Sequence, residues 1–415
     1  MYRFAACQSF AGGFDMGMVQ AGFEFVHKVE QAGGFGMENC LQNRHLLGSS
    51  WTHQSGDYLA WHAPDVDVLV ANPPCSGFSA MTDQRHRGID ARVNACMWVL
   101  MEYAARIKPQ IVIMESVRPA YSTGGSLMTA LRAKLEELTG LSYNLYHVMQ
   151  DAIELGGAAK RPRYFWVASR LPFGVDYPVV RTPALREIWS DLSGHAITWN
   201  EQPYRRPATW WSEEARSETG TFDGHITRNG TPVRRALDLL EWADDVGGWP
   251  AGAHIGEMAR RVYDHFGKLP ESWTGMTEKL VSTGFHMGYT SMIRWDPDRF
   301  GRVITGAALE LVLHPWESRT ITHREAARVM GFPDDWKILP LRRVSNLRAT
   351  WGKGITVHCG KWIGEQVQRA LDGEPGSITG ELVNDREWLI KNPRRVPMQP
   401  QPANLARLIS SKKGA

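Results

Sequence analysis

The chain has 415 residues, of which 22% are charged, and a formal net charge of +3. This length accommodates two domains with a sizeable core, and the composition is that of an ordinary globular protein. The small net charge does not require a polyanionic partner, although clustered Lys and Arg residues would permit one. There is no apolar run long enough to span a membrane and no signal peptide, so we expect a cytoplasmic protein.

The cysteines form neither a CxxC pair nor a zinc-ligand spacing, which excludes the common structural zinc sites. We therefore expect no metal, and free thiols in a reducing compartment. The five residues are Cys7, Cys40, Cys75, Cys96 and Cys359.

The N-terminal stretch predicts the start of a nucleotide-binding sheet. A strand over residues 2–7 leads into a tight turn at 9–14 and a short helix at 15–21. Glycines at such a turn let backbone amides approach a ligand near the positive end of the helix. A second strand over 23–29 ends in Glu30, the position from which an acid binds ribose hydroxyls in doubly wound folds.

A cysteine follows the next buried strand, predicted over residues 67–70. Pro73 and Pro74 end the sheet there, since neither donates a ladder hydrogen bond. Cys75 thus lies at the carboxyl end of a strand, where ligands bind in open α/β sheets. With Gly77 close behind it, this thiol has the features of a presented nucleophile. The alternative is a structural cysteine after a Pro-rich turn.

Two further predicted strands bear charged residues, one at its end and one along its length. The apolar run 111–114 is followed by Glu115, which is either a catalytic acid or a structural ion-pair partner. Between the cysteine and this strand, apolar residues at helical spacing predict a helix over 93–107 with Cys96 in the core. Further on, Arg161 and Arg163 alternate along a strand and therefore face one side, although two such arginines are more often surface charges.

These stretches together resemble the DNA cytosine-C5 methyltransferases in order and content. The resemblance covers residues 1–170 and 300–372, and its most specific motif is the Pro-Pro-Cys-x-Gly-Phe-Ser of the nucleophile loop. The other matching segments are Phe10–Met18, Glu115-Ser116-Val117, Lys160-Arg161-Pro162-Arg163, His314–Trp336 and Gly352–Val357. Within the segment His314–Trp336, Thr322 and Glu325 form a capping box at the start of a helix, and Gly331 and Pro333 end that helix. Arg319 is a candidate contact to the catalytic loop.

The resemblance implies a role for each matching residue. Cys75 attacks C6 of a cytosine flipped out of the helix, Glu115 assists at N3, and Arg161 and Arg163 fix the base and the cysteine loop. Backbone amides and the arginines should lower the pKa of Cys75. S-adenosylmethionine is the implied cofactor, held by Phe10, Ala11, Gly12, Gly13, Phe14, Glu30, Asp57, Pro73, Lys353, Gly354 and Ile355.

The resemblance also implies an architecture. We expect a doubly wound, Rossmann-like α/β methyltransferase sheet with a smaller target-recognition domain inserted. The expected divisions are a catalytic domain at 1–175, a recognition domain at 176–335, a return to the catalytic domain at 336–373 with a last helix over 361–371, and a basic flexible tail at 374–415. A cleft between the two domains would hold double-stranded DNA, gripped by basic residues and read by base-edge contacts.

Several positions depart from the family pattern. Ser76 replaces Gln, Ser116 replaces Asn, Ala159 replaces Gln, and the first motif lacks one Gly. At Lys353 the family has Asn, close to the methionine end of the cofactor. A Lys about 5 Å from the sulfonium would repel it by about 3 kcal/mol. Either this side chain points away, or the cofactor is carboxy-S-adenosylmethionine and the product 5-carboxymethylcytosine.

Two other classes of protein remain open from the sequence. The altered first and last motifs would suit an inactive DNA-binding relative, and an RNA cytosine methyltransferase would share most of the motifs. Among these alternatives we expect an active, monomeric enzyme that modifies double-stranded DNA in the cytoplasm of a bacterial or phage-infected cell.

Overall fold

The computed structural model describes most of the chain, namely residues 1–31, 36–79, 82–192, 232–287, 292–304, 312–317, 320–337 and 351–379. The chain divides into two compact units. Unit 1 comprises Met1–Gly157, Arg161–Arg181 and Lys353–Ala415, and unit 2 comprises Ala158–Lys160 and Thr182–Gly352. Arg319, residues 193–231 of the expected recognition domain, and the tail beyond residue 379 lie outside the described residues.

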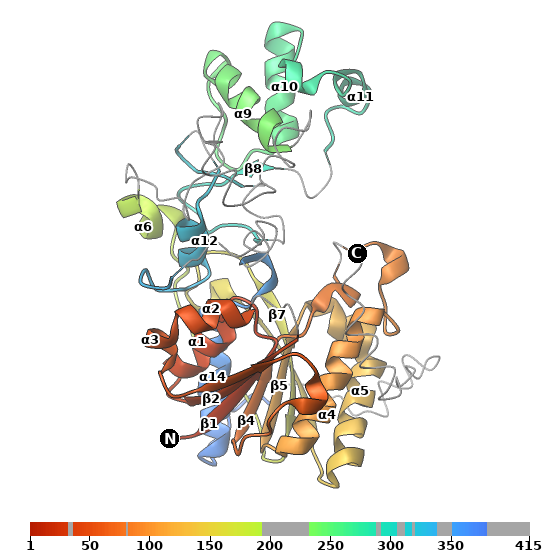
Figure 1. Cartoon of the computed structure of the whole chain (residues 1–415). Coiled ribbons are helices and arrows are strands. Elements are labelled where there is room, and N and C mark those ends of the chain that lie inside the picture. The colour runs from red at the N-terminus through yellow and green to blue at the C-terminus, as the bar shows by residue number, and fades with distance from the viewer. Residues whose placement is uncertain are drawn as a thin grey trace. The chain divides into compact units, whose positions relative to one another are not determined.

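Unit 1 is built on a seven-stranded sheet in the order β3-β2-β1-β4-β5-β7-β6 (Figure 1). All neighbouring strands are parallel except β7, which runs antiparallel to β5 and to β6. This confirms the predicted doubly wound α/β fold. The strands are β1 (Arg3–Cys7), β2 (Glu24–Glu30), β3 (Thr52–Ser55), β4 (Val68–Ala71), β5 (Ile111–Ser116), β6 (Asn144–Asp151) and β7 (Pro162–Ser169).

Helices cover both faces of this sheet (Figure 1). Those on one face are α4 (Ala95–Ile107) and α5 (Arg118–Thr139), whose apolar residues form one core with alternate residues of β1, β4, β5 and β7. The other helices of unit 1 are α1 (Gly13–Gln20), α2 (Gly36–Gln42), α3 (Arg44–Leu47) and α14 (Val357–Leu371), with short 3-10 turns η1 (Tyr58–Ala60), η2 (Cys75–Gly77), η3 (Gln84–His86), η4 (Arg92–Asn94) and η5 (Ala152–Leu155).

The last helix begins four residues earlier than expected, at Val357 rather than Lys361. The reason is its cap: the Thr356 hydroxyl accepts a hydrogen bond from the Cys359 backbone N–H at 3.2 Å. Helix α14 also packs against α1 almost backbone to backbone. A Cβ at Gly17 would lie 2.4 Å from the Gly360 carbonyl carbon, so only a residue without one fits. The two segments that begin at the carboxyl edge of the sheet are thereby held together.

The segment of unit 1 that precedes unit 2 ends later in the sequence than the predicted boundary at residue 175. Val175 pairs with Ile378 through backbone hydrogen bonds of 2.8 and 3.1 Å. Asp176 accepts hydrogen bonds from Ser377 and forms an ion pair with Arg369 on α14. These contacts keep residues up to Arg181 in unit 1, six beyond the expected boundary at 175, and they fix the first part of the expected tail.

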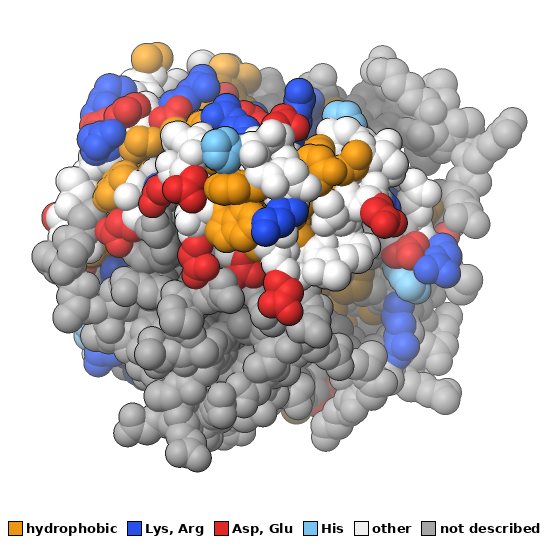
Figure 2. Space-filling model, turned by 90° about the horizontal axis from the view of Figure 1, so that it is seen from above, with side chains coloured by type: hydrophobic (Ala, Val, Ile, Leu, Met, Phe, Trp, Pro, Cys, Tyr) orange, Lys and Arg blue, Asp and Glu red, His pale blue; other side chains and the backbone are white. Residues whose placement is uncertain are grey.

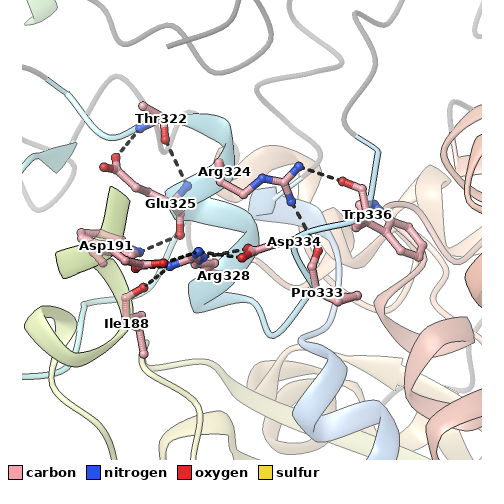
Figure 3. Close-up of polar contacts among 10 residues, drawn as sticks. Ile188, Asp191, Thr322, Arg324, Glu325, Arg328, Pro333, Asp334 and Trp336 are labelled. Atoms are coloured by element: carbon pink, nitrogen blue, oxygen red, sulfur yellow. Dashed lines mark hydrogen bonds and ion pairs between the residues drawn. The ribbon is translucent and has the colours of Figure 1, made fainter. Parts of the chain in front are cut away.

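In unit 2 a polar cluster surrounds α12 (His323–Val329), as Figure 3 shows. The predicted capping box is present: Thr322 caps the Glu325 N–H at 3.1 Å, and Glu325 accepts from the Thr322 N–H at 2.7 Å. Arg328 forms ion pairs with both Asp191 and Asp334. The other elements are α6 (Leu185–Trp189), η6 (Ser190–Leu192), α9 (Pro232–Ala243), η9 (Asp244–Val246), α10 (Ile255–Phe266), η10 (Glu271–Trp273), α11 (Thr277–Ser282), β8 (Ile293–Arg294) and β9 (Val312–Leu313).

Charges of both signs are intermixed among the described side chains on the face that Figure 2 shows. On α10 the charges pair along the helix: Arg260 lies 3.5 Å from Asp264, and Arg261 lies 3.1 Å from Glu257. Paired charges of this kind stabilise an exposed helix slightly and neutralise one another. The exposed face of α10 therefore carries paired charges rather than an uncompensated basic row.

Candidate active site

The predicted site residues of the first half lie at one edge of the unit 1 sheet. Parallel strands β1, β2, β3 and β4 end there. Glu30 is the last residue of β2, and the turn at Phe10, Asp57 and the Cys75 loop follow β1, β3 and β4. Strand β4 pairs with β5 so that Ala71 lies opposite Met114. The residues that come next along the two segments, Asn72 and Glu115, therefore also lie side by side. The sheet itself brings the cysteine loop beside the acid.

Cys75 opens a 3-10 turn and is the one half-buried thiol; the four other cysteines are buried. Its carbonyl accepts hydrogen bonds from the backbone N–H groups of Phe78 at 3.0 Å and Ser79 at 3.1 Å. The Phe78 ring packs into the core beneath. Gly77 accepts a hydrogen bond from the Gly88 N–H at 2.9 Å, which ties the turn to the polar segment after it. The loop thus presents its thiol from a fixed backbone.

The Glu115 carboxyl is buried and both of its oxygens have partners. Oε1 forms an ion pair with Arg163 Nε, and Oε2 accepts a hydrogen bond from Asn72 Nδ2. The alternation of side chains explains the meeting of the three residues. Leu69, Ala71, Val112 and Met114 face the α4–α5 core, so Asn72 and Glu115 face the opposite side of the sheet, as Arg163 does from β7.

Arg161 lies just before β7 and is also buried. Its Nε donates to the Gly354 carbonyl at 3.1 Å, and its Nη2 contacts the same oxygen. Gly354 belongs to the turn before α14, so this guanidinium joins the arginine strand to the last cofactor motif. Ile355, the next residue, is fully buried. The two predicted arginines are therefore brought together at the site, each with its own partner.

The charges in this cluster act on one another. Burial raises the pKa of Cys75, and the Glu115 carboxylate raises it further, whereas Arg163 and Arg161 lower it. The expected net lowering of this pKa is thus wrong, because burial and the Glu115 carboxylate together outweigh the arginines. Burial likewise raises the pKa of Glu115 against the opposing effect of both arginines. Burial and Arg163 lower the pKa of Arg161 to about 9.

The turn between β1 and α1 has an unusual backbone. Gln8 at φ 58° and Phe10 at φ 43° are in the left-handed region, as is Gly12 at φ 87°. Only two other non-glycine residues of the described chain have positive φ, so the strain is concentrated here. Such conformations cost about 1–3 kcal/mol each and are typical of ligand-binding turns. Ala11, Gly13 and Phe14 are buried against the unit, and Pro73 is buried beside the neighbouring strand end.

An acid and a close backbone approach lie beside this turn. The Glu30 carboxyl, at the end of β2, is 7% exposed. A Cβ at Gly36 would lie 2.8 Å from Glu30 Oε2 and 2.7 Å from the Phe10 carbonyl, so the α2 backbone approaches both. Asp57 is exposed and caps η1 by accepting from the Leu59 N–H at 3.1 Å. Three neighbouring strand ends thus offer the backbone amides of the turn, the Glu30 carboxylate and the Asp57 carboxylate. These groups suit the hydroxyls and the amino group of an adenosine.

Beneath the same turn lies a buried ion pair that sequence reasoning missed. Lys28 Nζ is 2.7 Å from Asp15 Oδ2, and both side chains are fully buried. The Ser9 hydroxyl donates to the same carboxylate at 2.7 Å, and the Cys40 thiol lies 3.0 Å from it. The cluster joins the turn to β2 and α2.

We expect Asp15→Asn to lower the free energy of unfolding by about 3–5 kcal/mol, because it leaves a buried lysine charge without its counter-ion. Urea denaturation measures the loss. The matched control is the double substitution Asp15→Leu with Lys28→Met, which removes both charges and should recover most of the stability. A loss below about 1 kcal/mol for Asp15→Asn would show that water solvates this pair.

Lys353 is exposed and stands one residue before Gly354. The other departures in unit 1 are accommodated in the fold: Ser76 is exposed, and Ser116 is buried at the end of β5. Asn72 was not among the predicted site residues, although its position after a buried strand, directly before the Pro-Pro-Cys segment, was a usable signal. Among the described residues, no group of His, Cys, Asp and Glu has the arrangement of a metal site, and no described helix is long and apolar enough to cross a membrane.

A doubly wound sheet with these side chains at its carboxyl edge is a Rossmann-like methyltransferase fold. A solved structure described as a DNA modification methyltransferase encoded within an Escherichia coli prophage superposes with a TM-score of 0.59 at 18% identity, covering 90% of this chain and all of that one. A methyltransferase of Entamoeba histolytica gives 0.54 at 10% identity, covering 90% and 98%. Identities this low show the fold alone.

The chain belongs to the C-5 cytosine-specific DNA methylase family, whose family model matches residues 2–369. The type II methyltransferase M.PspPI of Psychrobacter is 23% identical over 89% of this chain and 79% of its own length. M.DdeI of Desulfomicrobium norvegicum is 21% identical over 94% and 88%. DNA (cytosine-5)-methyltransferase 1A of rice is 22% identical over 75% of this chain, which spans only 22% of that protein.

Proposed function

We propose that this protein transfers a methyl group from S-adenosylmethionine to C5 of a cytosine in double-stranded DNA. The observation that carries the proposal is the meeting of Cys75, Glu115, Arg161 and Arg163 at the carboxyl edge of the sheet. The family membership and the likeness to two type II methyltransferases support it. We place the reaction in the cytoplasm of a bacterial or phage-infected cell, with the protein acting as a monomer.

The cytosine must leave the base stack, since C6 and C5 are shielded within the duplex. The Cys75 thiolate then forms a bond to C6, and the electron pair of the C5–C6 double bond moves into the ring toward N3. Glu115 in its acid form donates to N3 and stabilises this charge, and its raised pKa favours that form. Arg161 and Arg163 fix the Gly354 carbonyl and Glu115 respectively, so they orient the acid and the cofactor turn.

The strand-end acids and the strained turn fit S-adenosylmethionine. In our proposal Glu30 binds the ribose hydroxyls, Asp57 lies toward the adenine, and the 10–14 turn presents backbone amides. Pro73, Gly354 and Ile355 border the methionine end. When bound, S-adenosylmethionine would supply an electrophilic methyl group to C5, and the electron pair of the broken methyl–sulfur bond would stay on the sulfur. Loss of the C5 proton then returns an electron pair to the C5–C6 bond and breaks the bond to Cys75.

The coupled charges suggest an order of events. In the free protein the Glu115 carboxylate holds the pKa of Cys75 up, so the thiol resists ionisation. When Glu115 takes up a proton or shares one with N3, that negative charge is removed and the pKa of Cys75 falls. The thiolate therefore forms most readily once a base is in place, which limits reaction of the thiol with other electrophiles.

Duplex DNA containing 5-fluorocytosine tests the proposal, because fluorine at C5 cannot leave as a proton and the protein stays bound to the base. With S-adenosylmethionine we expect a covalent adduct whose mass maps to the Cys75 peptide. Competition by unmodified duplex DNA but not by tRNA would exclude an RNA methyltransferase. Binding to DNA without any adduct would favour an inactive DNA-binding relative and overturn the proposal.

A carboxymethyl group is the second candidate for the transferred group. It rests on Lys353, which replaces a neutral residue of the family pattern and adjoins the Gly354 turn. A carboxylate on carboxy-S-adenosylmethionine would balance that cation. Mass spectrometry of nucleosides after reaction with each cofactor decides between the two products. Better transfer of methyl than of carboxymethyl by the parent protein, unchanged in Lys353→Asn, would eliminate the carboxymethyl alternative.

A further inference from the structure

Asn72 is a buried side chain that the proposed chemistry does not use, yet it contacts the central acid. It is 1% exposed, and its Nδ2 donates to Glu115 Oε2. Its backbone N–H donates to the Cys7 carbonyl at 3.2 Å, which continues the pairing of β4 with β1 beyond the end of the strand. Asn72 is therefore fixed on two sides: by the sheet through its backbone and by the acid through its amide.

We propose that Asn72 is a positioning residue that holds the Glu115 carboxyl and sets how readily it is protonated, a role that rests on the proposed function of Glu115. Cys75 comes three residues after Asn72. The same backbone segment therefore carries both the nucleophile and the side chain that holds Glu115. A shift of this segment would move both together relative to the base.

The chemistry of the amide fits this role better than that of a charged residue. An N–H that donates to a carboxylate stabilises the charged form and so lowers the pKa of the acid. Asn72 Oδ1 is buried and has no hydrogen-bond partner among the described residues. An amide turned by a half rotation would offer this oxygen to a protonated Glu115 instead. One side chain can thus serve both protonation states of the acid.

The other groups that face Glu115 come from three elements. Arg163 and Arg161 act from β7 and the residue before it, and both lower the pKa of Glu115. Cys75 acts from η2, and Cys359 on α14 is coupled to Glu115 with a pKa that burial raises to about 12. Cys359 therefore stays neutral near pH 7. Asn72 is thus a neutral donor that stabilises the Glu115 carboxylate in the same direction as the two arginine cations.

The test uses Asn72→Leu, which keeps the size and removes the donor, and Asn72→Asp, which replaces the donor with a like charge. Both changes should raise the pKa of Glu115, by about one unit for Leu and more for Asp. Isotope-edited infrared titration of the carboxyl stretch measures this, with Glu115→Gln assigning the band. Since the acid form is active, the alkaline fall in kcat should move to higher pH, while kcat at its maximum falls about tenfold or more.

The two readouts separate the two proposals. The infrared titration needs no turnover, so an unshifted Glu115 pKa in both variants would overturn the role of Asn72 even if the parent protein methylates DNA. A shifted pKa in a protein that forms no adduct with 5-fluorocytosine would confirm the contact and reject the proposed function. Asn43→Asp, which alters a buried asparagine that bonds the Asn39 carbonyl at 2.8 Å, is the matched control. It should shift neither readout.

Discussion

Replacing Cys75 with serine is expected to lower methyl transfer to duplex DNA by roughly a thousandfold or more, with DNA binding retained. A serine hydroxyl ionises far less readily than a thiol, and the nearby Glu115 carboxylate opposes ionisation further. The change alters little else, because Cys75 is half-buried and the η2 turn is held by backbone hydrogen bonds. Transfer of a labelled methyl group and a DNA-binding titration measure the two effects separately.

The control for this variant is Cys96→Ser. Cys96 is buried on α4, and its sulfur accepts a hydrogen bond from Gln31 Nε2 at 3.1 Å. It has no role in the proposed chemistry. We expect it to cost stability but to keep transfer activity where the protein is folded. More than a few per cent of parental activity in Cys75→Ser, at an unchanged melting temperature, would remove Cys75 as the nucleophile.

Replacing Glu115 with glutamine is expected to change two measurements in opposite directions. Methyl transfer should fall about 100- to 10,000-fold, because no acid remains to stabilise charge at N3. The Cys75 thiol should instead become more reactive. The Glu115 carboxylate raises the pKa of Cys75, so its removal lowers that pKa. The pH dependence of iodoacetamide labelling at Cys75 measures this shift.

Opposite effects of this kind distinguish a charge effect from a damaged fold. A misfolded variant would expose the four buried thiols and label them as well. Glu137→Gln on the exposed side of α5 is the matched control and should leave both labelling and transfer unchanged. If Glu115→Gln labels at the same pH as the parent, the two groups are not coupled and the proposed order of events is wrong.

The strands and the helix after the cysteine loop were predictable because each repeats a local pattern. Strand β4 and the first four residues of β5 are uninterrupted apolar runs, and α4 shows helical spacing. The capping box at Thr322 was predictable for the same reason, since a cap depends on residues three apart. Helix α5, with 22 residues, was not predicted, because its sequence begins with Arg-Pro and contains two adjacent glycines.

What the sequence by itself determined is the order of the chemistry-bearing segments: an acid after β2, a cysteine after β4, an acid at the end of β5 and arginines at β7. Those positions follow from local patterns and motifs. Only the tertiary structure decided which groups meet. Asn72 and Arg163 share the Glu115 carboxyl, and Lys28 pairs with Asp15, through strand register and helix packing. Burial is likewise a property of the whole fold, which is why the pKa of Cys75 is raised although two arginines lie nearby.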